Sequence, residues 1–168
     1  VVAPVEIVLV PGNHDTERAF MLGEVLAAHY RLDDCVTVRN DPAPRTYVLW
    51  GNVLLGLAHA VGEKPGDLAQ IMATEAPQEW AASAGGWREW HVGHLHRKRE
   101  GLAWHVEEDR GVRVRWMPTL APRDAWAAGK GYLHLRAAEA YLWHRTDGYV
   151  GTFSVSVTAP AAGTLSYQ

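Results

Sequence analysis

The first thirty residues combine an apolar run with an amphipathic stretch. Residues 5–10 (VEIVLV) are rich in β-branched side chains and lead into a Pro-Gly pair, a pattern typical of a buried strand that ends in a tight loop. From residue 16 to about residue 30, apolar side chains recur at helical spacing and are expected to share one face with His29. These side chains are Ala19, Leu22, Val25 and Leu26. The pattern predicts a strand, a loop and a helix, with Asp15 or Thr16 as the helix N-cap.

Downstream patterns predict strands joined by short turns. Residues 47–50 and 53–59 flank Gly51-Asn52, a two-residue turn whose members both tolerate a positive φ. A helix is expected from residue 65 or 67 to residue 74, broken by Pro77. Further strands are expected at residues 36–38, 87–94, 102–106, 112–116, 138–144 and 149–157, with a helical turn near residues 124–128. Strands outnumber helices, but the initial strand and helix favour an α/β fold in a single domain.

Composition and charge exclude several classes of protein. The 168 residues fit one domain, and a chain of this length can bury roughly 70% of the surface that its unfolded form exposes. Sixteen Lys and Arg against 19 Asp and Glu give a net charge of -3, so there is no chain-wide basic field to attract nucleic acid. The longest apolar runs fall well short of the about 20 residues of a membrane span. The single cysteine, Cys35, favours a reducing, cytoplasmic compartment.

Four of the nine histidines lie beside glycines at the ends of predicted strands. They occur in GNHD (residues 12–15), GLAH (residues 56–59) and GHLH (residues 93–96). On a strand, His94 and His96 point to the same face, as two metal ligands must. Asn13 adds a neutral oxygen ligand, and His14 beside it is available as a general acid. Taken singly, an H-x-H pair is more often a polar strand face, and GNHD is a common turn sequence.

The order of these motifs resembles that of the calcineurin-like metallophosphoesterases, in particular their DNA-repair-exonuclease-like branch in phages and bacteria. The segments VPGNHD, LGLAH and GHLHRK, within residues 10–98, carry the resemblance, and residues 117–153 also resemble the phage branch. It implies a sandwich of two mixed β-sheets flanked by helices, with two divalent metal ions at the strand ends. Manganese is the metal that the family favours, and zinc or iron also suits Asn and His ligands.

The resemblance also implies a role for each motif residue. Asn13, His59 and His94 would bind one metal ion, and His96 would bind the other. His14 would protonate the leaving group, while Asp15 would orient His14 or cap the helix that follows. The function implied is a metal-dependent phosphoester hydrolase, a phosphodiesterase or nuclease acting on DNA.

Three departures from the family pattern bear on activity. The family signature opens with D-x-H and G-D motifs that supply the remaining ligands and a bridging carboxylate. Here no Asp is followed two residues later by His, and Gly66-Asp67 lies after GNHD. We expect the missing ligands to lie upstream in the natural protein, so that residues 1–168 are the C-terminal portion of a phosphoesterase domain with weak or no activity alone. Ala60 stands where the family usually has Gly, and its methyl group is expected to narrow the pocket.

Basic and aromatic residues near the motifs suggest contacts with substrate. Arg97 and Lys98 directly follow the His pair, where they could hold a DNA backbone. Most of the eight tryptophans are expected in the core. Trp87 and Trp90 are the best candidates to stack on bases because they bracket the approach to the site.

Two other functions remain open at this stage. The chain could be a non-catalytic module that binds nucleic acid or serves assembly. It could instead be a mononuclear zinc hydrolase that uses His59, His94 and His96. The sequence leaves the exact substrate and the oligomeric state open.

Overall fold

A computed structural model describes residues 3–93, 106–121, 129 and 136–157. The first unit is the expected strand, loop and helix. Strand β1 (Val5–Val8) pairs in parallel with β2 (Val36–Arg39), and helix α1 (Thr16–Tyr30) packs against β2. The mixed α/β content confirms the expected fold class at that level.

Helix α1 has the expected bounds, but its apolar face is not the most buried one. Gly23 faces inward, next to the Asn40 side chain, whose Nδ2 donates to the Phe20 carbonyl at 3.0 Å. Leu22 and Val25 are therefore turned outward and are 52% and 64% exposed. The two residues share a face, as their helical spacing predicts, but the face around Gly23 is the one turned inward, because glycine, which has no side chain, permits the closest approach.

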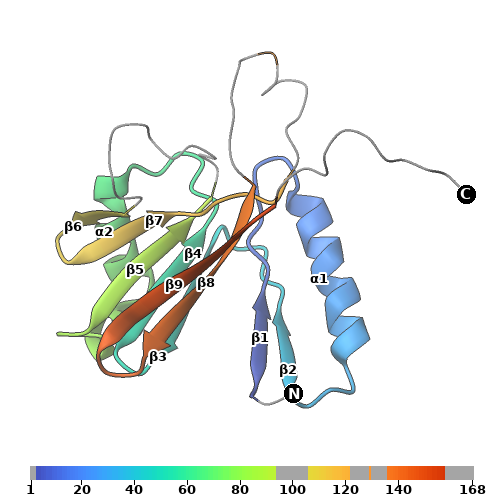
Figure 1. The fold of residues 1–168 in the computed structure, drawn as a ribbon, viewed down its shortest axis with the longest axis horizontal. Helices are drawn as coiled ribbons and strands as arrows, with labels where there is room; N and C mark the ends of the chain where they lie inside the picture. The colour runs from blue at the N-terminus through green and yellow to red at the C-terminus, as the bar shows by residue number, and fades with distance from the viewer. Residues whose placement is uncertain (1–2, 94–105, 122–128, 130–135, 158–168) are drawn as a thin grey trace, which may run out of the picture.

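A five-stranded mixed sheet forms the centre of the molecule. Its order is β3-β4-β5-β7-β6, in which β4, β5 and β7 run parallel and the two outer strands run antiparallel to their neighbours. Its strands are β3 (Arg45–Trp50), β4 (Val53–Ala58), β5 (Trp87–Val92), β6 (Val106–Asp109) and β7 (Val112–Trp116). Figure 1 shows β1, β4 and β5 ending on the same side of the molecule.

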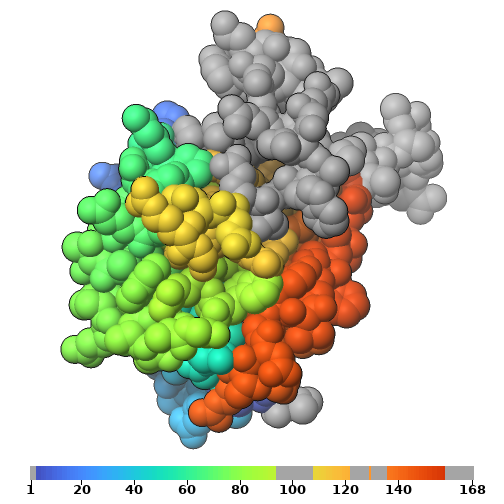
Figure 2. Space-filling view, turned by 90° about the vertical axis from the view of Figure 1, so that its left-hand side faces the viewer, coloured from blue at the N-terminus to red at the C-terminus, as the bar shows by residue number. Residues whose placement is uncertain are grey.

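Two helices and a hairpin cover opposite faces of this sheet (Figures 1 and 2). The helices are α2 (Pro65–Glu75) and α3 (Pro77–Ala82), and the hairpin consists of β8 (Ala137–His144) and β9 (Gly148–Ser156). Pro77 begins α3 rather than only ending the helix before it, because proline is well tolerated in the first turn of a helix.

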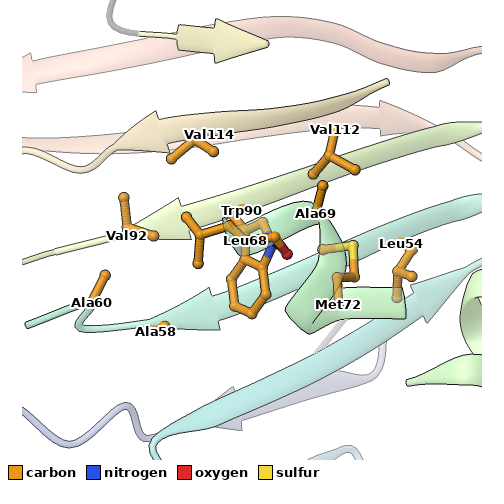
Figure 3. Packing of buried hydrophobic residues seen from close by; sticks show 10 residues of the cluster. All are labelled: Leu54, Ala58, Ala60, Leu68, Ala69, Met72, Trp90, Val92, Val112 and Val114. Atoms are coloured by element: carbon orange, nitrogen blue, oxygen red, sulfur yellow. Dashed lines mark hydrogen bonds between the residues drawn. The ribbon is translucent and has the colours of Figure 1, made fainter. Parts of the chain in front are cut away.

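The core lies between the sheet and α2 (Figure 3). It is centred on Trp90, whose Nε1 donates to the Leu68 carbonyl at 3.0 Å. Gly56 on the adjacent strand makes room for the indole, since a Cβ at that position would lie 2.5 Å from Cε3 of Trp90. The buried cluster consists of Leu54, Ala58, Ala60, Leu68, Ala69, Met72, Trp90, Val92, Val112 and Val114.

The hairpin β8–β9 is held against the other face of the sheet by aromatic and charged groups. The Trp87 ring stacks on Tyr149 with centroids 5.9 Å apart. The fully buried Glu89 pairs with Arg115, whose guanidinium also lies over the Tyr141 ring. At the far end, the turn between β3 and β4 contacts the turn between β8 and β9: the amide of Asn52 donates to the Arg145 carbonyl at 3.1 Å.

Most of the predicted strands are confirmed within one or two residues. In the Gly51-Asn52 turn, only Gly51 has a positive φ, at 60°. Strand β6 begins at the end of the expected 102–106 range and extends to Asp109. Residues 102–105 and the helical turn expected near residues 124–128 lie outside the described residues. In the described part of the chain, no helix is long and apolar enough to cross a membrane.

Candidate functional site

The ends of β1 and β4 bring two predicted ligands into contact. Asn13 lies in the loop between β1 and α1, and His59 directly follows β4. Oδ1 of Asn13 lies 3.1 Å from Nε2 of His59, although the two residues are 46 positions apart in sequence. Asn13 is exposed, and His59 is partly buried. The carboxyl ends of strands are where α/β proteins usually place functional groups, so this contact marks the candidate site.

The GNHD turn is closed by its own hydrogen bonds. Oδ1 of Asp15 accepts from the Gly12 amide at 2.8 Å, and the Thr16 hydroxyl donates to the Gly12 carbonyl at 2.7 Å. Asp15 occupies the N-cap position of α1, but its carboxylate makes no capping bond to the helix. The expectation that the Asp15 side chain caps the helix is therefore wrong. Its carboxylate instead shapes the loop that presents Asn13 and His14. His14 is exposed.

The imidazole of His59 lies against the end of β5. A Cβ at Gly93 would lie 3.1 Å from Nδ1 of His59, so glycine is the residue that leaves space for the ring. The Gly93 amide also donates to the Ala58 carbonyl at 3.1 Å. These contacts connect the strand that ends in His59 to the strand that leads into the GHLH motif.

Ala60 lies in the left-handed region with a φ of 59° and is only 7% exposed. This conformation explains why glycine would fit the position, because a Cβ costs about 1–2 kcal/mol there. The Ala60 methyl group packs in the hydrophobic cluster (Figure 3). The expectation that it narrows the pocket is therefore wrong, since the methyl group faces the core.

Substitutions at Ala60 should separate backbone strain from packing. We expect Ala60→Gly to change the unfolding free energy by less than about 1 kcal/mol, because relief of strain offsets the lost methyl burial and the added freedom of the unfolded chain. Ala60→Val should cost at least about 2 kcal/mol because a β-branched side chain overfills the core in a strained conformation. Urea unfolding measures both values. A neutral valine variant would contradict this account.

A charged cluster that sequence patterns do not predict lies next to the end of β4. Arg45, opposite Ala58 in the β3–β4 register, donates to Glu63 at 2.7 Å and to Glu75 at 2.7 to 3.0 Å. The Tyr47 hydroxyl donates to Glu75 at 2.7 Å. The two-residue turn fixes the hairpin register and places Arg45 next to the end of β4. Its carboxylate partners lie in a loop and at the end of a helix. The pattern of hydrophobic residues does not show that these two segments lie close to Arg45.

The cluster is charged at neutral pH. The hydrogen bond from Arg45 lowers the pKa of Glu75 and outweighs the opposing effect of burial. Burial raises the pKa of Glu63, but hydrogen bonds from backbone amides and from Arg45 reverse this effect and give a net lowering. The pKa of Arg45 is raised, chiefly by its hydrogen bond to Glu75.

The remaining predicted site residues, His94, His96, Arg97 and Lys98, lie outside the described residues. Within the described ranges, no group of three or more His, Cys, Asp or Glu side chains could hold a metal ion. The Asn13 and His59 donors do fit one cation: metal bonds of about 2.1 Å set adjacent ligands about 3 Å apart, close to their observed separation of 3.1 Å.

The structure also separates the two tryptophans proposed for base stacking. Trp90 is fully buried, so the expectation that it stacks on bases is wrong. Trp87 is partly buried, and its ring contacts Trp143, Tyr149 and Arg113. It therefore serves to hold the hairpin to the sheet.

The strand ends thus bring one pair of predicted ligands together, next to the loop that presents a third residue, His14. The chain was also compared with known proteins. No protein-family model, no curated protein and no solved structure matches it.

Proposed function

We propose that this chain carries part of the active site of a metal-dependent phosphoester hydrolase, a phosphodiesterase or nuclease that acts on DNA. The observation that carries the proposal is the 3.1 Å contact between Asn13 and His59 at the strand ends. The two residues come from separate motifs, and each is a ligand type that divalent cations accept. The family resemblance of the motif order supports the same function, and with it the two-sheet sandwich.

In this proposal, different residues bind the metal ions, donate a proton and bind the substrate. Asn13, His59 and His94 would hold one divalent ion, and His96 would hold the second. Such ions, manganese foremost, polarise a water molecule and offset the charge that develops on the phosphoryl group. His14, adjacent to Asn13 on an exposed loop, would donate a proton to the leaving oxygen. Arg97 and Lys98 would bind the phosphate backbone of the substrate.

The donor set explains why we expect little turnover from residues 1–168 alone. Imidazole and amide groups are neutral, so nothing in this set offsets the repulsion between two cations a few ångströms apart. A bridging carboxylate would supply that negative charge. We therefore propose that one cation binds to this chain weakly and that full activity needs carboxylate ligands of the kind that D-x-H and G-D motifs supply.

Binding of Mn²⁺ tests the metal site directly. In NMR spectra, Mn²⁺ should selectively broaden the signals of the Asn13 side-chain amide and the His59 imidazole, because paramagnetic broadening acts at short range. His59→Ala should weaken Mn²⁺ binding by about tenfold or more. His29→Ala, at an exposed histidine on α1, is the matched control and should leave binding unchanged. Equal broadening at Asn13 in the wild type and in His59→Ala would contradict the assignment.

Hydrolysis of bis(p-nitrophenyl) phosphate with added Mn²⁺ tests the reaction. We expect near-background turnover from residues 1–168, and robust turnover would contradict the need for further carboxylates. A polypeptide that also carries D-x-H and G-D motifs should be active and should lose activity on His59→Ala. Absence of those motifs from the coding sequence, or an inactive longer polypeptide, would overturn the proposed function. One tightly bound zinc with esterase or amidase activity would instead indicate a mononuclear hydrolase.

A further inference from the structure

We propose that Arg45 is a positioning residue for His59 and that it acts through Glu63. The proposal rests on the proposed function in one respect, namely that His59 is a metal ligand. The relevant feature is the loop of residues 59–64, which connects β4 to α2. His59 is its first residue, and Glu63 lies near its other end.

The loop is held at both ends by specific contacts. At its start, the His59 ring lies against Gly93, and Ala60 is fixed in the left-handed region with its methyl group in the core. Near its end, Oε1 of Glu63 accepts from Nη1 of Arg45 at 2.7 Å, while Oε2 accepts from the Gly62 amide at 3.1 Å. A loop this short leaves few backbone torsions free once both ends are fixed. Loss of the contact between Glu63 and Arg45 should therefore change the position of the His59 imidazole.

Arg45 is suited to this role by its position and chemistry. Its backbone lies opposite Ala58, the residue before His59. Its side chain is mostly buried, as is that of Glu63, with exposed fractions of 23% and 18%. Guanidinium is a rigid planar donor that keeps its charge at all relevant pH values. It can therefore bind two carboxylates at once in a fixed geometry.

The two carboxylates of Arg45 have different surroundings, which makes the proposal testable. Glu75 is the last residue of α2 and also accepts from Tyr47, so its contact ties the helix end to β3. Glu63 belongs to the loop that begins with His59. If Arg45 only stabilised the fold, loss of either contact would have the same effect on His59. A positioning role requires that only the Glu63 contact affects the imidazole.

The test compares Glu63→Gln with Glu75→Gln in the full 168-residue chain. Each variant removes one negative charge from Arg45 and leaves the other carboxylate in place. The readouts are the side-chain ¹⁵N signals of His59 at fixed pH, the affinity for Mn²⁺ and the midpoint of thermal unfolding. We expect Glu63→Gln to shift the His59 signals and to weaken Mn²⁺ binding by up to about tenfold, the lower end of the effect of direct partners of metal ligands. Glu75→Gln should lower the midpoint but leave the His59 signals and Mn²⁺ affinity close to those of the wild type.

The outcomes separate this proposal from the proposed function. Unchanged His59 signals in Glu63→Gln would overturn the positioning role, as would shifts of equal size in both variants. If the wild-type chain binds no Mn²⁺, the proposed metal site is wrong. The His59 signals of the variants would still decide whether Arg45 positions His59. Arg45→Met removes both contacts and should reproduce the His59 shift of Glu63→Gln together with the lower midpoint of Glu75→Gln. A His59 spectrum of Arg45→Met identical to that of the wild type would also overturn the proposal.

Discussion

Replacement of Trp90 by alanine is expected to lower the unfolding free energy by about 3–5 kcal/mol. The indole is fully buried, packs edge-on against Tyr47 at 5.4 Å between ring centroids, and donates to the Leu68 carbonyl. Truncation would leave a large cavity beside Gly56 and would remove the hydrogen bond to the Leu68 carbonyl. The core between the sheet and α2 would lose the residue that fills it.

Trp50→Ala is the matched control because Trp50 is 54% exposed and contacts the Arg145 guanidinium at 5.7 Å from its ring centroid. This substitution should cost less than about 1 kcal/mol, the typical size of an exposed cation–π contact. Urea titration should give different midpoints for the two variants with similar slopes. Similar losses for both variants would show that Trp90 is not the centre of the core.

The second large effect is expected for Glu89→Gln, which should lower the unfolding free energy by about 3 kcal/mol at neutral pH. The carboxylate is fully buried and accepts hydrogen bonds from Arg115, from His91 and, at 3.0 Å, from Nε1 of Trp87. Glutamine has nearly the same shape but no charge, so the largely buried Arg115 guanidinium would lose its counter-ion. Removal of one partner of a buried ion pair typically costs about 3–5 kcal/mol.

The same carboxylate predicts how stability depends on pH. Burial raises the pKa of Glu89, but the hydrogen bonds from His91, Arg115 and Trp87 prevail and lower it from 4.5 to about 2. A pKa that is lower in the folded state gives a stabilisation that is complete above pH 4.5 and is lost as the pH falls towards 2. The wild type should therefore lose roughly 3 kcal/mol over this window, whereas Glu89→Gln should lack that part of the loss.

Glu108→Gln is the control for this experiment. Glu108 lies on the same sheet and pairs with Arg113 at 3.1 Å, but its side chain is mostly exposed. Such surface pairs contribute about 0–1 kcal/mol. Urea titrations from pH 2 to 7 should show the acid-dependent loss in this variant as in the wild type. If Glu89→Gln and Glu108→Gln had the same pH profile, the buried pair would not be its source.

Local patterns were sufficient for the elements whose partners are close in sequence. The bounds of α1 and β7 agree with the prediction, and so does the β3–β4 turn. Helix spacing and two-residue turns are set by residues a few positions apart, so these elements are readable from the chain alone. The family resemblance placed Asn13 and His59 on one metal ion, and their side chains do lie in contact, although β1 and β4 belong to different sheets.

The errors arose where distant partners decide the outcome. Trp87 and Trp90 were expected to bracket one approach, but residues three apart on a strand point to opposite faces, so Trp90 enters the core while Trp87 faces the hairpin. From its charge alone, Glu89 would be expected at the surface. Its burial is explained by Arg115, which is 26 positions away in sequence but lies on the neighbouring strand. The partners of Arg45 were missed for the same reason, since Glu75 is 30 positions away.

The contact between the two hairpin turns joins segments that are far apart in sequence, which bears on the order in which we expect the chain to fold. The Asn52 side chain donates to the Thr146 carbonyl across 94 positions of sequence, and closure of a loop that long costs roughly 4 kcal/mol of chain entropy. The β3–β4 hairpin forms across only two turn residues, so we expect the docking of β8–β9 to follow it. During synthesis, the sheet face that holds Trp87 and Glu89 stays uncovered until residues 137–157 have emerged from the ribosome. That interval is when the nascent chain is most exposed to aggregation.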